Sequence, residues 1–134
     1  MSKSVSSVFL LLVIVQALHS IEEYFGELWN VFPPAEWLTG LISNDRHIGF
    51  LVANIGIFVL GLICWYFLVK NNPIAKAAIW FWIVIELMNG IIHPAWSIMQ
   101  KSYMPGVFTS LILFLVSVYL IKVIYDDKVR SSIS

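Results

Sequence analysis

Long apolar runs constrain what this chain can fold into more than any other feature of its sequence. Residues 48–69 contain no charged side chain, and residues 107–124 contain only Lys122, near their end. A helix needs about 20 mostly apolar residues to cross the hydrocarbon layer of a membrane. Hydrophobic residues make up 60% of the 134 residues and charged residues 12%, which is too apolar for a soluble domain of this size. The sequence therefore predicts an all-α integral membrane protein.

Two further apolar runs contain polar residues. Residues 77–99 are long enough to span a membrane, but they include a carboxyl, an amide and an imidazole side chain. Residues 8–18 reach only about half the required length, so a spanning helix must extend through the polar stretch 19–23. A signal peptide also begins with a charge and a short apolar core, but no small-x-small cleavage pattern follows. We expect one domain, residues 1–134, with spans at about 5–25, 48–69, 75–99 and 106–124.

The basic residues predict how the spans are oriented. With four spans, both termini and the loop at 70–76 share one side, which holds six of the eight Lys and Arg residues. The other side holds only Arg46 and Lys101. The positive-inside rule therefore places both termini in the cytoplasm, and the short connections favour a four-helix up-down bundle in the plasma or inner membrane. The net charge of zero gives no basic surface for nucleic acid.

Polar side chains gather at one depth of the predicted bundle. His19, Glu22 and Glu23 are spaced i, i+3 and i+4, so they project from one helix face. In the third span, the spacing from Glu86 to His93 also selects one face. At about 1.5 Å per residue, His19 and Glu86 each lie about 20 Å from the cytoplasmic side. Three amides at this depth either link helices or orient ligands or substrate: Gln16, Asn54 and Asn89.

The charge of these groups requires a cation or protons. A carboxylate in mid-span with no Lys or Arg at its depth is costly unless it is protonated, paired or bound to a cation. His and Glu side chains suit zinc, iron or manganese, so the first hypothesis is a site for one or two divalent metal ions. The alternative is a metal-free acid/base pair. The predicted metal ligands are His19, Glu22, Glu23, Glu86 and His93, and the candidate catalytic groups are Glu22, Glu23, Glu86 and Tyr103.

Three sequence elements resemble the HXXEE domain family. The family pattern is H-x-x-E-E, a later histidine and Y-x-P-G, which correspond here to residues 19–23, His93 and residues 103–106. The elements occur in the same order, and the resemblance covers nearly the whole chain. It implies a small multi-helix membrane domain of uncharacterised function and names no reaction. Pro105 suits a first helical turn and Gly106 permits a close approach, while Tyr103 either anchors at the interface or reaches the pocket.

The leading functional hypothesis is a membrane metalloenzyme with its site in the outer half of the bundle, which hydrolyses a lipid-like or other hydrophobic substrate. One alternative is a Glu/His acid-base isomerase or cyclase of a terpenoid or sterol-like molecule. A second is a cation or proton transporter, although the cytoplasmic half has almost no polar lining.

Two other features bear on partners. We expect the aromatic loop at 26–47 to lie on the membrane surface, as an anchor among membrane lipids or as a lid over the pocket. Gly49 and Ala53 have the small-xxx-small spacing of a close helix contact, either within one chain or in a homo-oligomer.

Overall fold

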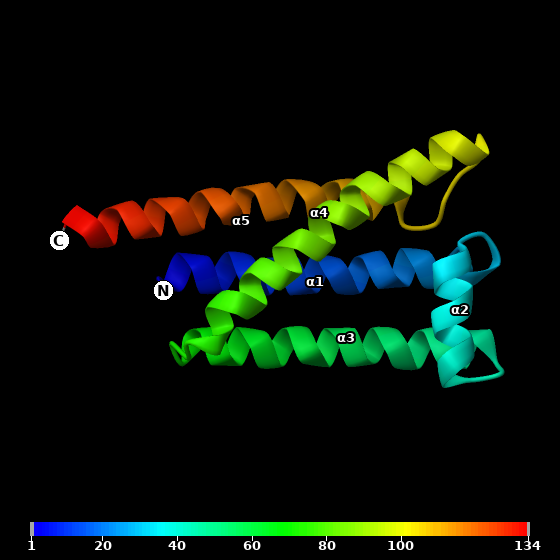
Figure 1. Cartoon of the computed structure of the whole chain (residues 1–134), viewed down its shortest axis with the longest axis horizontal. Coiled ribbons are helices and arrows are strands. Elements are labelled where there is room, and N and C mark those ends of the chain that lie inside the picture. Colours follow the sequence, from blue (N-terminus) through cyan, green and yellow to red (C-terminus); the bar gives the residue numbers. More distant parts are fainter. Residues whose placement is uncertain (1, 134) are drawn as a thin grey trace.

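Helices make up nearly all of the computed structural model, which describes residues 2–133 (Figure 1). No strand occurs in these residues, so the all-α prediction is confirmed. The elements in chain order are α1 (Lys3–Phe25), the short 3-10 helix η1 (Leu28–Asn30), α2 (Pro33–Ile42), α3 (Arg46–Val69), α4 (Ile74–Gln100) and α5 (Val107–Ile133).

The four long helices, α1, α3, α4 and α5, are each long and apolar enough to cross a membrane. The chain is therefore an integral membrane protein, as the apolar runs predicted. The helices agree closely with the expected spans except at the end of α5, which continues beyond residue 124 to Ile133. Its last turns carry charged residues, including Arg130, and so extend past the apolar part of the helix.

Polar residues at the helix ends explain where α1 and α3 begin. The side chain of Ser2 accepts a hydrogen bond from the backbone N–H of Val5, at 3.4 Å. Asp45 does the same for the N–H groups of His47 and Ile48, at 2.9 and 3.2 Å. These caps satisfy donors that have no partner within the first helical turn, which fixes the start of each helix.

The segment between α1 and α3 corrects one prediction. We expected a loop over residues 26–47, whereas the structure forms η1 and α2 there. Pro33 and Pro34 occupy the first turn of α2, where a missing N–H costs nothing. A Cβ atom added to Gly49 would lie 2.4 Å from the carbonyl oxygen of Thr39, so α2 packs directly on the backbone of α3.

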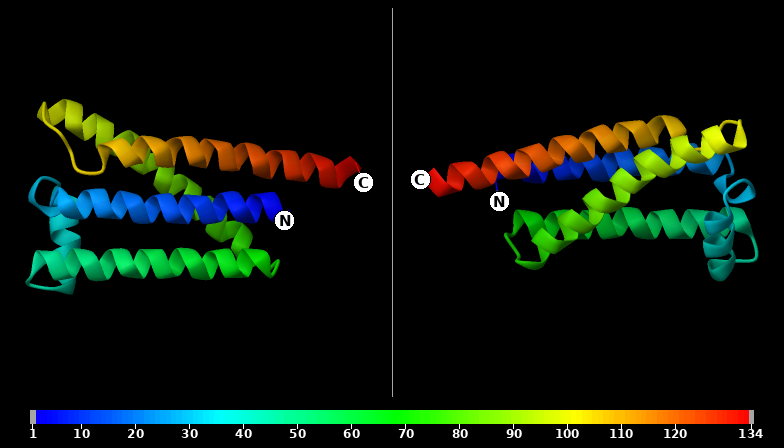
Figure 2. Two further views of the ribbon diagram at one scale, coloured as in Figure 1. Left: turned by 180° about the vertical axis from the view of Figure 1, so that it is seen from behind. Right: turned by 45° about the horizontal axis from the view of Figure 1, so that its top comes forward.

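The long helices are arranged around α1, which lies between α3 and α5 (Figures 1 and 2). Helix α4 crosses over α1 from the end of α3 to the beginning of α5, so α3 and α4 diverge along their length (Figure 1). Where α4 meets α5 the contact is close, because a Cβ on Gly90 would lie 2.5 Å from Cβ of Phe114. The beginning of α1 and the end of α5 lie at one end of the molecule, and α2 lies at the other.

Two apolar clusters divide the interior of the bundle. The larger joins α1, α3, α4 and α5 toward the end with the termini and includes Phe9, Leu12, Ile79 and Leu113. The smaller lies at the end of the bundle that carries α2 and consists of Leu28, Trp29, Phe50 and Met104. Between the two clusters lies a layer of buried polar side chains: Gln16, His19, Ser20, Glu23, Glu86 and His93.

Candidate metal centre

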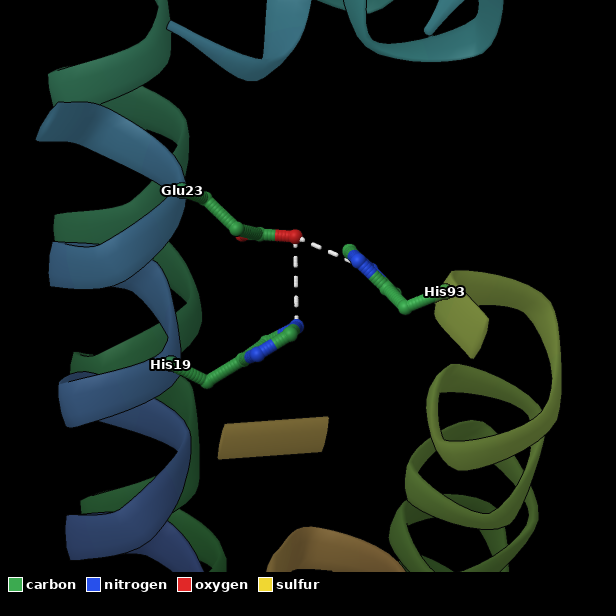
Figure 3. Close-up of side chains that lie close together, drawn as sticks. All are labelled: His19, Glu23 and His93. Atoms are coloured by element: carbon green, nitrogen blue, oxygen red, sulfur yellow. Dashed lines mark ion pairs between the residues drawn. The ribbon is translucent and has the colours of Figure 1, made fainter. Parts of the chain in front are cut away.

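Three side chains of the polar layer converge on one point. His19 and Glu23, one turn apart on α1, and His93 of α4 point toward one another (Figure 3). The Nε2 atoms of His19 and His93 each lie 3.2 Å from Oε1 of Glu23. One potential ligand atom from each residue lies within 4.8 Å of the other two, and all three residues are buried. Among the described residues, this is the group of His and acidic side chains that could hold a metal ion.

The hydrogen bond on the far side of the His93 ring determines which nitrogen carries the proton. Nδ1 lies 2.8 Å from the carbonyl oxygen of Pro105, in the connection between α4 and α5. A carbonyl oxygen only accepts hydrogen bonds, so Nδ1 must be the protonated nitrogen. In the neutral ring, Nε2 then presents a lone pair toward Glu23.

The same tautomer follows for His19 from its hydrogen bond to Thr109, which in turn bonds to Glu22. Its Nδ1 lies 2.8 Å from Oγ1 of Thr109, at the beginning of α5. The Thr109 hydroxyl donates to Oε2 of Glu22 at 2.5 Å, and it has only one hydrogen to give. It must therefore accept from Nδ1–H of His19. Glu22 thus fixes the tautomer of His19 through Thr109, and Nε2 of His19 also presents a lone pair toward Glu23.

This arrangement has the donor set and outer hydrogen bonds of a metal site. Metal-binding histidines almost always donate their second N–H to a carboxylate, a carbonyl or water, which fixes ring orientation. Ligand atoms on a tetrahedral zinc ion are about 3.3 Å apart, since each is about 2.0–2.2 Å from the metal. The two 3.2 Å separations match that spacing. Nε2 of His19 is also fully buried without a hydrogen-bond partner of acceptable geometry, although Glu23 Oε1 is near.

Gly106 allows the two imidazoles to approach the connection before α5. A Cβ atom at this position would lie 2.7 Å from Cε1 of His19 and 2.8 Å from Cε1 of His93. Gly106 also has φ of +90°, a conformation that side chains strongly disfavour. The backbone at residue 106 is therefore one wall of the site, and only glycine fits there.

Glu86 faces the same region from α4 but lies outside the group of three. Its carboxylate is fully buried and accepts a hydrogen bond from Nδ2 of Asn89 at 3.0 Å. When the side-chain nitrogen of Gln16 is assigned to the position that faces Glu86, it donates hydrogen bonds to both carboxylate oxygens of Glu86, at 2.9 and 3.1 Å. Two of the predicted amides, Gln16 and Asn89, thus hold a second carboxyl group that lines the same cavity as Glu23.

Glu22 and Tyr103 lie apart from the convergence point, although both were predicted site residues. Glu22 accepts four hydrogen bonds, from Tyr103 Oη at 2.6 Å, from the Thr109 hydroxyl and from the N–H groups of Phe108 and Thr109. It therefore caps the beginning of α5. Burial raises the pKa of the Tyr103 phenol to about 12, with further contributions from the hydrogen bond to Glu22 and the charge of that carboxylate.

The third predicted amide connects α1 and α3. Ser20 donates to Oδ1 of Asn54 at 2.6 Å, and the Asn54 amide nitrogen donates to the carbonyl oxygen of Phe50 at 2.9 Å. Sequence reasoning had not selected Ser20, Thr109 or the Pro105 carbonyl. Thr109 carried a usable signal, because it is a hydroxyl residue at the beginning of an apolar span, but no sequence signal marks a backbone carbonyl.

A cavity of about 390 Å³ adjoins the site and is bounded by α1, η1, α2, α3 and α4. No Lys or Arg occurs among its described lining residues. Seven of the nine predicted site residues line it, all except Glu22 and Tyr103: Gln16, His19, Glu23, Asn54, Glu86, Asn89 and His93.

The residues of this site include the H-x-x-E-E, His93 and Y-x-P-G elements of the sequence, and comparison with known proteins identifies the same family. Residues 10–120 match the model of a family described as "Protein of unknown function with HXXEE motif". The chain belongs to the HXXEE family. No curated protein and no solved structure matches the chain. In this HXXEE protein, the histidine and second glutamate of the motif lie at the convergence point, and its first glutamate holds the beginning of α5, just after the Y-x-P-G segment.

Proposed function

We propose that this protein is a membrane-embedded metalloenzyme in which His19, Glu23 and His93 hold one divalent ion. The observation that carries the proposal is the hydrogen bonding of both Nδ1 atoms to groups that accept from them. With both protons on Nδ1, the Nε2 lone pairs of His19 and His93 face Oε1 of Glu23. No hydrogen-bond donor lies among these three atoms unless a proton is added. A divalent cation satisfies all three atoms at once, and the matching 3.2 Å separations support this arrangement.

The donor set also supports a catalytic rather than a purely structural ion. Two histidines and one carboxylate leave at least one coordination position open, as in catalytic zinc sites and in mononuclear iron sites. Zinc in such a site lowers the pKa of bound water to about 7. Glu86 lines the same cavity with two amides fixing its carboxylate, and we assign it the role of accepting a proton from that water. Hydrolysis is therefore the reaction we propose first.

The proposed site lies in the outer half of the membrane, and its substrate is a lipid or another hydrophobic molecule. The end with both termini carries most of the basic residues, which favours a cytoplasmic position for that end. Between that end and the site the described buried residues are mainly the larger apolar cluster, with Ser117 as a buried polar side chain among them, and so apolar an interior argues against a transporter.

Elemental analysis of the detergent-purified protein tests the metal. We expect about one zinc, iron or manganese ion per chain, and its loss in Glu23→Gln and in His93→Ala. Matched controls are Glu36→Gln and His47→Ala, which change exposed residues of the same types and should retain the ion. A metal-free protein that binds none of the three metals on addition would contradict the proposal and favour the metal-free acid/base alternative.

Hydrolysis has its own test, in vesicles that contain long-chain ester substrates. We expect release of fatty acid by the metal-loaded protein and none after chelation, with activity restored by the metal alone. Glu86→Gln should keep the ion but lose most of the activity, by about 10²–10⁴-fold if Glu86 acts as the base. A Glu86→Gln variant with full activity would exclude that role for Glu86.

A further inference from the structure

The route into the cavity follows from the divergence of α3 and α4. These helices meet near the 70–73 connection and separate toward α2 (Figures 1 and 2), and residues of both helices line the cavity. Helix α2 bounds one end of the cavity, with Leu38 and Thr39 among the lining residues. Gly49 allows α2 to rest on the α3 backbone at this end of the cavity.

The rim of the cavity faces lipid rather than water. Three lining side chains on three helices are also well exposed: Leu38 of α2 (45%), Leu60 of α3 (47%) and Phe81 of α4 (58%). Two of these belong to membrane-spanning helices, whose exposed surfaces contact hydrocarbon chains. The cavity therefore opens sideways into the bilayer, and a molecule that enters it there must be soluble in lipid.

The polarity of the lining changes along the cavity. The part of the cavity farthest from α2 is lined by Ile57, Leu60 and Phe81, whereas His93, Glu23 and Asn89 lie nearer to α2. From Phe81 to His93 the cavity follows α4 for about 18 Å, at 1.5 Å per residue. An occupant that satisfies this lining has a hydrocarbon chain that lies along Ile57, Leu60 and Phe81 and a polar group directed toward the metal centre.

From these observations we infer that the cavity takes a single-chain amphiphilic lipid, which enters between α3 and α4 and presents its polar head to His19, Glu23 and His93. The volume of about 390 Å³ is near the lower end of the range for ligand pockets, which suits one hydrocarbon chain better than two. This inference rests on the proposed function for the role of the head group, but the fit of the hydrocarbon chain depends only on the cavity.

Photolabelling tests the inference. The probe is a long-chain lysophosphatidylcholine with a diazirine near the end of its chain, added to vesicles that contain the protein, and labelled residues are mapped by mass spectrometry. We expect labels concentrated on Ile57, Leu60 and Phe81. Ala53→Trp fills the cavity wall and should lower labelling there about tenfold. Val52→Trp is the matched control, because Val52 is an exposed neighbour on α3 that does not line the cavity.

Metal content, measured on the same samples, separates the two proposals. Ala53→Trp should retain the metal while it loses the label. Labelling that is equal in Ala53→Trp and in the unchanged protein, or spread evenly over all lipid-facing surfaces, would overturn the inference even if the metal is present. Cavity labelling in a protein that binds no metal would support the inference that the cavity holds a hydrocarbon chain. It would overturn only the proposed metal function.

Discussion

At the scale of single residues, the HXXEE motif divides into two roles. Glu22 and Glu23 are adjacent on α1 and therefore project about 100° apart around the helix axis. Glu23 lies between the two histidines, whereas Glu22 reaches Thr109 and Tyr103 of the neighbouring segment. The i, i+3 and i+4 spacing predicted that all three motif side chains share a face. It did not separate the glutamates, because their roles depend on where α4 and α5 lie.

Thr109 provides a test of the outer hydrogen bonds. Thr109→Val keeps the shape of the side chain but removes the acceptor for Nδ1–H of His19. We expect zinc affinity to fall about 10–100-fold, as is usual when an outer partner of a metal ligand is lost. Thr109→Ser keeps the hydroxyl and should bind zinc almost normally. Competition with a chelating dye measures both variants, and equal affinity of the Val variant and the unchanged protein would show that Thr109 does not position His19.

Tyr103 provides a pH prediction. Its pKa is raised from 10.0 to about 12, first by burial and then by the hydrogen bond to Glu22 and the charge of that carboxylate. A raised pKa means that the folded protein favours the neutral phenol, so this contribution to stability is present below pH 10 and is lost as the pH rises toward 12. Absorbance titration near 295 nm should show a late-titrating tyrosine that disappears in Tyr103→Phe and titrates earlier in Glu22→Gln. An unchanged titration in Glu22→Gln would contradict this cause.

At the scale of helices, the sequence predicted the four spans well and missed α2. Uninterrupted apolar length identifies a spanning helix because the backbone must satisfy its own hydrogen bonds in lipid. The ten residues of α2 are too few for that signal. Two local features did indicate a helix, namely prolines in the first turn and Glu36 near its N-terminus. The exposed Trp37 and Leu41 fit a helix at the membrane surface.

The contact of α2 with α3 can be tested by adding one methyl group. Gly49→Ala places a Cβ against the Thr39 carbonyl, where backbone rather than a flexible side chain must move. We expect this to cost about 1–3 kcal/mol and to accelerate hydrogen exchange across residues 33–42, measured by mass spectrometry. Gly56→Ala is the control, since its Cβ would meet nothing within 4 Å. Unchanged exchange in Gly49→Ala would show that α2 is not held by this contact.

At the scale of the whole molecule, the polar layer links α1 and α4 at a level between the two apolar clusters. The ligands come from α1 and α4, and the groups that orient them come from α5 and the segment before it. Counting residues along each predicted span was enough to predict that α1 and α4 bring these groups to one level in the membrane. The crossing of α4 over α1, which leaves α3 and α4 separated beside the site, depends on packing and was not predicted from the chain.

A bound ion should therefore stabilise the entire bundle. Zinc at about 100 times its dissociation constant adds about 2.7 kcal/mol, which corresponds to an increase in Tm of about 5–10 °C for a chain of this length. Thermal unfolding in detergent, followed by circular dichroism, measures the change. The increase should be absent in His93→Ala and present in His47→Ala. Equal increases in both variants would indicate zinc bound elsewhere.

¹⁵N NMR of the histidine rings, in the metal-free protein and after one equivalent of zinc, tests the proposed metal centre directly. We expect that His19 and His93 are Nδ1–H tautomers without metal, that zinc shifts the Nε2 signals of both, and that His47 does not respond. Nε2–H tautomers or imidazolium rings at His19 and His93, with no change on addition of zinc, would contradict it.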